Sequence, residues 1–281
     1  MAEGKEKRHA GMQITSGFQG VGKTYLNMHI IAKYVKDKIT TKVKGRKVLI
    51  IDTNGEFTKD QFNENGIPNF NPVNIGIKDV AHWSISDIVE CRRIDIKSLS
   101  IPEKKNLVIN ALKDFKNGML VLEDINTYIM SATHMEEIVG GLVNLRHRGV
   151  DILISYQSLR AVDPLMYRNS RWVRMHYQVD SIDDIIGKIP NPSLYKIAQL
   201  IVNDKYLNQG EKRFYLYIQN ADQNLRGAFS KADFKKAVRK YIFLNKKMIK
   251  DFMLMEQVKE DQAIEMLMRQ YYNQYYGNDN K

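Results

Sequence analysis

The feature that most constrains the fold is a glycine-rich turn that ends in Lys-Thr. Residues 11–24 read GMQITSGFQGVGKT, in which Gly17, Gly22, Lys23 and Thr24 fill the pattern G-x-x-x-x-G-K-[ST]. A short apolar run precedes the turn, and apolar residues at helical spacing follow it. This strand–turn–helix context is the one that a phosphate-binding loop requires, whereas a glycine turn that carries Lys-Thr by chance needs no such context.

The residue types of the turn predict how it would bind a nucleotide. Successive backbone N–H groups would surround the phosphates, and the N-terminus of the following helix would add partial positive charge. Lys23 would neutralise phosphate oxygens, Thr24 would ligate Mg²⁺ through its hydroxyl, and Gly20 allows a close approach of the backbone. We therefore predict ATP and Mg²⁺ as ligands, contacted by residues of one continuous segment: Gly17, Gly20, Val21, Gly22, Lys23, Thr24 and Tyr25.

The remaining chain alternates short apolar runs with helical stretches, which is typical of an α/β fold with a mainly parallel central sheet. Strands are predicted at residues 47–52, 92–96, 119–124, 150–157, 171–179 and 213–219, and helices at 101–118 and 135–149. We expect a basic N-terminal tail over residues 1–10, an ATPase domain over 11–229, and a C-terminal helical extension over 230–281. Residues 231–275 are expected to form two helices or one broken helix, followed by a frayed tail.

Acidic residues follow two of the predicted strands. Glu123 and Asp124 end the apolar run 119–122, at the carboxyl edge of the sheet where ligands bind in such folds. Glu123 is predicted to support Mg²⁺ and Asp124 to activate the attacking water. Asp52 and Glu56 lie in the sequence IDTNGEF, where they either serve the nucleotide edge or form an Asn-Gly turn that caps a strand.

Three further polar positions are candidates for catalysis. Gln157 ends an apolar strand, where its carboxamide would sense the γ-phosphate or serve only as an ordinary strand end. Arg146 and Arg148 precede that strand, and one of them would reach the γ-phosphate of a neighbouring subunit. The alternative for the arginines is a basic helix end favoured by the helix dipole, and Arg160 is a rival for the same role.

Composition limits the setting and the partners. Of 281 residues, 43% are hydrophobic and 27% charged, as in a folded protein, and the formal net charge is +11. Such a basic excess indicates a polyanionic partner, nucleic acid or an anionic membrane. No apolar stretch is long enough to cross a membrane and the first residues do not form a secretory signal, so we expect a cytoplasmic protein. The single cysteine, Cys91, excludes an intramolecular disulfide.

The order and spacing of these blocks resemble the FtsK/HerA superfamily of P-loop ATPases, which pump DNA through ring-shaped assemblies. The blocks are GFQGVGKT, VLIIDTNGEF, LVLED, LRHRGVDILISYQSLRAVDP and NSRWVRMHYQVDSIDDII, within residues 11–187. The resemblance implies a RecA-like fold of the additional-strand (ASCE) type, with the acidic pair on a strand that is not adjacent to the P-loop strand. It also implies a ring, most simply a hexamer, that moves DNA for packaging or transfer in a phage or mobile element, within the host cytoplasm.

Two features of the chain differ from that family or extend beyond it. The acidic pair reads Glu-Asp where the family reads Asp-Glu, which keeps open a nucleotide-binding structural protein with vestigial hydrolysis. A second alternative is an assembly or secretion ATPase of the Zot type that acts with a portal, capsid or membrane protein. Lysine and arginine gather at residues 33–47 and 231–247, where they would either contact the DNA backbone or cover solvated helix faces.

Overall fold

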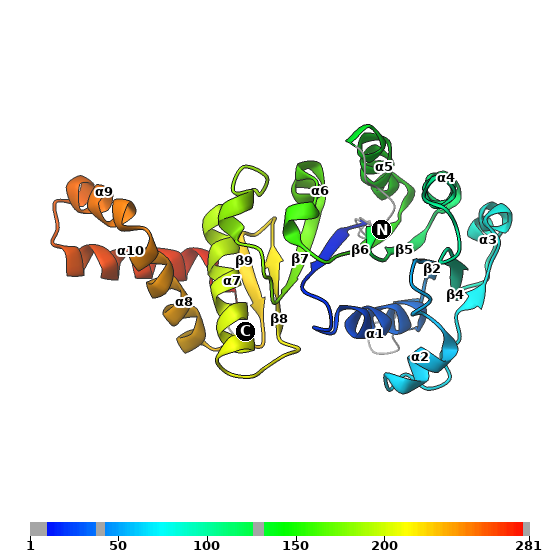
Figure 1. The fold of residues 1–281 in the computed structure, drawn as a ribbon, viewed down its shortest axis with the longest axis horizontal. Helices are drawn as coiled ribbons and strands as arrows, with labels where there is room; N and C mark the ends of the chain where they lie inside the picture. The colour runs from blue at the N-terminus through cyan, green and yellow to red at the C-terminus, as the bar shows by residue number, and fades with distance from the viewer. Residues whose placement is uncertain (1–9, 38–42, 126–131, 278–281) are drawn as a thin grey trace, which may run out of the picture. The chain divides into compact units, whose positions relative to one another are not determined.

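The computed structural model describes residues 10–37, 43–125 and 132–277, and Figure 1 shows their secondary structure. These residues divide into two compact units. The first holds Gly22–Tyr156 and the start of the chain as far as Gln13, and the second holds Ile14–Val21 and Gln157 onwards. Most of the expected N-terminal tail, Lys38, Lys42 and the last four residues lie outside the described part of the chain.

The strands have the order β3-β4-β2-β5-β6-β1-β7-β8-β9. In the first unit, β2 (Lys47–Asp52) pairs in parallel with β4 (Cys91–Asp95) and with β5 (Gly118–Leu122), and β5 pairs in parallel with β6 (Asp151–Tyr156). The two-residue β3 (Val73–Asn74) extends the parallel set beside β4. Because β6 lies between β5 and the P-loop strand β1 (Met12–Ser16), the predicted additional-strand order is confirmed.

The helices of the first unit cover two faces of these strands (Figure 1). Met28 and Ile31 of α1 (Lys23–Val35) pack on alternate strand residues, among them Val48, Val121 and Leu153. On the other side, α4 (Ile101–Asp114) packs against α5 (Ala132–Leu145). The short helices α2 (Lys59–Glu64) and α3 (Val80–Ile85) complete this unit, and the buried strands make its core continuous.

The second unit contains the antiparallel part of the sheet. β7 (Ser170–His176) pairs with β8 (Tyr215–Gln219), and β8 pairs with β9 (Asn224–Gly227). α6 (Pro164–Asn169) leads into β7, and α7 (Pro192–Leu207) packs on β8. The α7 helix begins where the Asn191 side chain accepts a hydrogen bond from the backbone N–H of Leu194 and where Pro192 supplies a favourable first residue.

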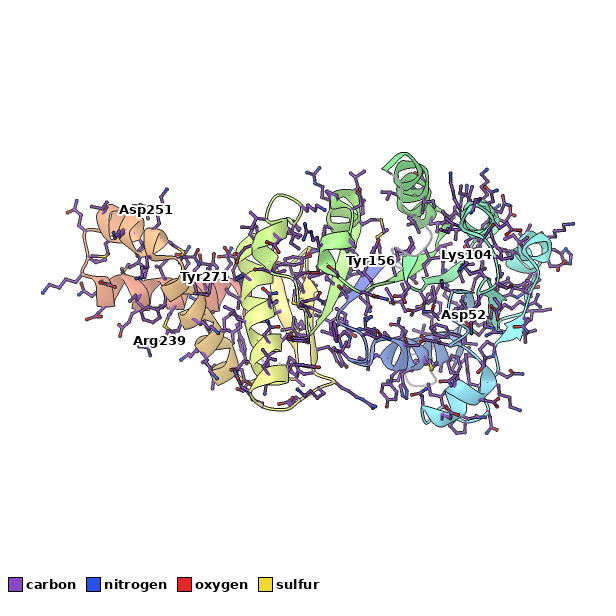
Figure 2. All side chains as sticks on the ribbon, in the orientation of Figure 1. Asp52, Lys104, Tyr156, Arg239, Asp251 and Tyr271 are labelled. Carbon is purple, nitrogen blue, oxygen red and sulfur yellow. The ribbon has the colours of Figure 1, made fainter. Side chains whose placement is uncertain are left out.

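Three helices follow near the C-terminus, rather than the expected two or one: α8 (Lys231–Leu244), α9 (Lys246–Glu256) and α10 (Glu260–Tyr275). The extra break lies at Gln257, whose positive φ of 54° ends α9. The tyrosines of α10 pack locally, since the rings of Tyr271 (labelled in Figure 2) and Tyr241 meet at 5.5 Å. Among the residues that the structure describes, no helix has the length and apolar character to cross a membrane.

Candidate nucleotide site

The P-loop backbone takes the conformation that its glycines predict. Gly20 has φ of 81° and Gly22 has φ of 88°, in the left-handed region that side chains disfavour. Gly22 is also the N-cap of α1, and no acidic residue lies in the first turn of that helix. The partial positive charge of the helix N-terminus is therefore not offset by a carboxylate of its own turn.

Gly17 is required by packing rather than by its backbone angles. A Cβ placed on Gly17 would lie 2.6 Å from the Cβ of His176, so β7 leaves no room for a side chain. The backbone N–H of Phe18 donates to the carbonyl of Tyr177 at 2.9 Å, and the Gln178 amide donates to Ser16 at 3.2 Å. Within the second unit, the block RMHYQVD therefore supports the start of the P-loop.

The first turn of α1 carries the residues that would contact phosphate and metal. Lys23 is 9% exposed, and Thr24 donates from its hydroxyl to a carboxylate oxygen of Glu56 at 3.0 Å. One turn further, the buried Asn27 points its amide at Glu123. All five residues belong to the first unit, so the end of α1 that carries Lys23 also presents a hydroxyl and an amide to two carboxylates.

Asp52 and Glu56, which the sequence left undecided, have different roles. Asp52, labelled at the end of β2 in Figure 2, accepts hydrogen bonds from the backbone N–H groups of Gly55, Glu56 and Phe57. Its second oxygen also meets the guanidinium of Arg93 at 2.9 Å, and the Asp52 side chain is 1% exposed. Asp52 thus holds the loop that places the exposed Glu56 beside Thr24.

Glu123 is buried, and a hydrogen bond from Asn27 holds its carboxylate. It is 3% exposed, and the Asn27 amide donates to its carboxylate at 2.6 Å and to the Ser155 hydroxyl at 2.9 Å. Burial raises the pKa of Glu123 to about 7, while the hydrogen bond from Asn27 opposes the shift and nearby Asp124 adds to it. A bound cation would favour the charged carboxylate.

Asp124 follows directly in an unusual backbone conformation. Its φ is 43°, and its carboxylate accepts a hydrogen bond from the side-chain amide of Asn54 at 3.1 Å. The Thr53 hydroxyl donates to the carbonyl of Glu123 at 2.9 Å, which ties the loop after β2 to the loop after β5. The loop after β2, which the sequence left undecided, and the loop with the predicted acidic pair are therefore joined at the carboxyl edge of the sheet.

The oxygen atoms at this edge fit Mg²⁺. Thr24 supplies a hydroxyl, and Glu56 and Glu123 supply carboxylates, which are the hard ligands that this ion prefers. No group of three or more His, Cys, Asp or Glu suited to a metal occurs among the described residues. That finding is compatible with Mg²⁺ in a nucleotide site, because one or two protein ligands and the phosphates suffice there.

The remaining predicted residues lie at opposite ends of β6. Gln157 directly follows the last residue of the strand and is exposed. Arg146 and Arg148 lie in a 3-10 turn before the strand begins. Arg148 donates through Nη1 to the carbonyls of Leu112 and Lys113 at 2.9 and 2.6 Å, and the side chain of Arg146 lies outside the described residues.

The comparisons with known proteins show a fold. No family model and no curated protein sequence matches the chain. The genome packaging NTPase B204 from Sulfolobus turreted icosahedral virus 2, in complex with sulfate, superposes with a TM-score of 0.52 and 15% identity, covering 77% of this chain and 95% of that chain. The chain has a P-loop NTPase-like α/β fold.

Two further structures superpose less well. B204, the DNA-packaging ATPase from Sulfolobus Turreted Icosahedral Virus, has a TM-score of 0.49 and 14% identity, covering 77% of this chain and 95% of that chain. The N-terminal domain of zonular occludens toxin from Neisseria meningitidis has a TM-score of 0.32 and 16% identity, covering 59% and 76%. Superpositions this weak add nothing to the assignment of the fold.

Asn27 was missed by the sequence reasoning, although a signal for it exists. It lies four residues after Lys23, so both side chains share one face of α1. A polar amide on the face that carries Met28 and Ile31 into the core requires a buried partner. Ser155, inside the apolar run of β6, carried the same signal and is part of the same hydrogen-bond network.

Proposed function

We propose that the chain is an ATPase motor that works as a ring and moves DNA during genome packaging or transfer. One observation carries this proposal. Within the first unit, Lys23 and Thr24 of the P-loop helix lie at the same edge as Glu56 and Glu123, and Asn27 fixes Glu123 directly. A site for nucleotide binding alone needs the P-loop, whereas hydrolysis also needs carboxylates at the metal and the water.

Each predicted residue has a separate role in the proposed hydrolysis of ATP. Lys23 and the N–H groups of the P-loop bind the phosphates, while Thr24 and Glu123 would hold Mg²⁺, whose charge would offset that of the phosphates. Asp124 orients and activates the attacking water, with Glu56 as a competing candidate because of its contact with Thr24. Gln157 senses the γ-phosphate, and Arg146 or Arg148 acts on the nucleotide of a neighbouring subunit.

The DNA part of the proposal is supported by charge and by analogy. A formal net charge of +11 suits a partner with a repeating phosphate backbone. The superposed structure is that of a genome packaging NTPase, which supports a packaging function by analogy of fold. A hexamer remains the expected assembly.

The test is steady-state ATP hydrolysis with and without long double-stranded DNA, with Lys23→Ala as the blank. Turnover that rises with DNA and disappears in the Lys23 variant supports the proposal. Turnover that is the same with and without DNA favours the Zot-type assembly ATPase.

A second candidate function rests on Asp124. Its carboxylate accepts a hydrogen bond from Asn54, and the pair reads Glu-Asp, so Asp124 would be a structural acceptor in a nucleotide-binding protein with vestigial hydrolysis. Asp124→Asn decides between the two roles. Loss of turnover with retained ATP binding supports Asp124 as the catalytic base, and unchanged turnover rejects that role.

A further inference from the structure

A basic hollow of about 590 Å³ lies in the first unit, away from the carboxylates described above. Four of the six residues that line it carry basic side chains, and none of the six carries a carboxylate. Lys113, Lys116, His147 and Arg148 are all exposed. The lining residues are Lys113, Lys116, Asn117, His147, Arg148 and Gly149.

Two left-handed turns build the floor of the hollow. Asn117, before β5, has φ of 56°, and Gly149, before β6, has φ of 70°. The backbone N–H of Asn117 donates to the carbonyl of Arg148 at 3.1 Å, so the two turns lie side by side. Since β5 and β6 are paired neighbours, the basic side chains stand on a fixed base.

Contacts around the floor of the hollow add rigidity. Arg46 donates to the carbonyl of Gly149 and forms an ion pair with Asp151 at 3.4 Å. Arg148 uses Nη1 to hold the last carbonyls of α4, and a guanidinium has five N–H donors in all. The hollow is thus a preorganised cationic surface on the ends of two strands and one helix.

This surface is separate from the nucleotide site of the same chain. β5 runs from Gly118 beside the hollow to Leu122 beside Glu123, a five-residue strand that spans roughly 15 Å. A phosphate in the hollow would therefore not be a phosphate of the nucleotide on Lys23. The hollow needs another source of phosphate.

We propose that the hollow binds the phosphate backbone of double-stranded nucleic acid. Exposed lysines on a shallow basic surface suit backbone contacts, which position a duplex without reading its sequence. A single bound nucleotide would instead call for a cradle of backbone N–H groups, as in the P-loop. This inference rests on the proposed function, because it names the surface on which the motor would hold its DNA.

The test compares Lys113→Gln/Lys116→Gln with wild type and with Lys78→Gln/Lys250→Gln, which removes two exposed lysines elsewhere. Binding of a random-sequence DNA duplex is measured over a range of salt concentrations, together with ATP hydrolysis. The hollow variant should bind duplex roughly tenfold more weakly at low salt, and the slope of log affinity against log salt should fall by about 1 to 2. The control variant should change both quantities much less, and Lys113→Arg/Lys116→Arg should restore binding.

Each outcome has a separate meaning. Equal losses in the hollow variant and the control overturn the inference, because net charge alone then accounts for binding. If the hollow variant binds duplex as wild type does but hydrolyses ATP more slowly at low protein concentration, the inference is also overturned. The hollow then has only the role that Arg146 or Arg148 has in the proposed function, on a nucleotide held by a second copy. If wild type neither binds duplex nor responds to it, the proposed function itself fails.

Discussion

Two acidic residues four positions apart, Asp52 and Glu56, differ in their contacts: the first supports a loop of the fold, and the second contacts the P-loop helix. Asp52 accepts from three backbone N–H groups and from Arg93, whereas Glu56 is exposed and meets Thr24. The sequence IDTNGEF could not distinguish them, because both follow the same strand. The difference lies in Arg93, which comes from β4, a strand far along the chain.

Substitution of the two acids should separate stability from activity. Asp52→Ala leaves three buried or partly buried N–H groups without their acceptor and removes the buried ion-pair partner of Arg93, which keeps its contacts with Asp95 and Asn74. Unfolding in urea should therefore show a loss of about 2–4 kcal/mol. Glu56→Gln should change the free energy of unfolding by less than about 0.5 kcal/mol but lower ATP turnover roughly tenfold or more. Full activity in Glu56→Gln would remove Glu56 from the site.

Asn27 should matter for both folding and turnover. Asn27→Ala removes a donor to the buried Glu123 and should lower the free energy of unfolding by about 1–3 kcal/mol. Since the carboxylate would lose its fixed orientation, kcat should fall while ATP binding is retained. Asn63→Ala, on the exposed face of α2, is the control, and equal kcat values in the two variants would contradict a positioning role.

Gly17 offers a test of the P-loop support. Gly17→Ala places a methyl group 2.6 Å from His176, so the loop must shift and ATP affinity should fall at least severalfold. The measurement is ATP binding by titration calorimetry, with Gly187→Ala as the control because a Cβ there meets nothing within 4 Å. Normal ATP affinity in Gly17→Ala would show that the packing against β7 is dispensable.

At the scale of elements, the strongly apolar strands were predictable, whereas some short or amphipathic elements were missed. The expected strands at 47–52, 119–124 and 150–157 correspond to β2, β5 and β6, because buried parallel strands are largely continuous apolar runs. The expected short strand at 92–96 corresponds to β4, although its sequence CRRID is mostly polar. β3 has two residues and no such signal. The helix α7 was also missed, although Asn191 and Pro192 mark its start.

The candidate site was predictable in part for the same reason. The acidic pair follows β5 as expected, since the carboxyl ends of parallel strands meet at one edge. The contacts of Thr24 with Glu56 and of Asn27 with Glu123 join residues 32 and 96 positions apart. Pairings of this kind depend on the strand order, which no local pattern determines.

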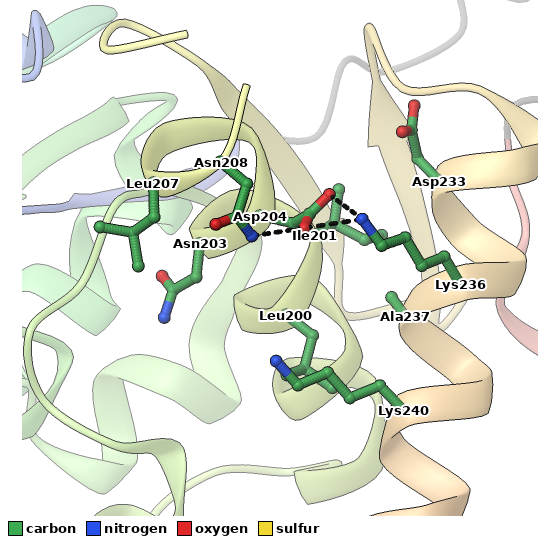
Figure 3. Close-up of a pocket in the computed structure, with 10 residues that line it drawn as sticks. All are labelled: Leu200, Ile201, Asn203, Asp204, Leu207, Asn208, Asp233, Lys236, Ala237 and Lys240. Atoms are coloured by element: carbon green, nitrogen blue, oxygen red, sulfur yellow. Dashed lines mark hydrogen bonds and ion pairs between the residues drawn. The ribbon is translucent and has the colours of Figure 1, made fainter. Parts of the chain in front are cut away.

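The contact between α7 and α8 predicts a pH dependence. Lys236 donates to both carboxylate oxygens of Asp204 at 2.8 and 2.9 Å, beside a pocket lined by Leu200 and Ala237 (Figure 3). The hydrogen bond from Lys236 lowers the pKa of Asp204 to about 2. Because the pKa of Asp204 is lower in the folded state, its charged carboxylate stabilises the fold above the ordinary pKa of about 4. This stabilisation is lost as pH falls toward 2.

Asp204→Asn measures that contribution. The variant should lose about 0.2–1 kcal/mol of unfolding free energy at pH 7, because Lys236 is largely exposed, and less as pH falls from 5 toward 3. Urea unfolding at several pH values gives the difference directly. A loss that stays constant with pH would show that the charge of Asp204 does not contribute.

At the scale of the whole molecule, the two ends of the same strands differ in charge. Carboxylates gather after β5, and exposed basic side chains gather before β5 and β6. The first arrangement suits a metal–nucleotide complex, and the second suits a polyanion. We therefore expect nucleotide and DNA to bind simultaneously and each to affect the binding of the other.

The proposed motor is tested by ATP turnover as a function of added double-stranded DNA, with Lys23→Ala measured in parallel. Turnover should rise with DNA in the wild-type chain and be absent in the variant. Turnover of wild type that stays the same at every DNA concentration, or that persists in Lys23→Ala, would contradict it.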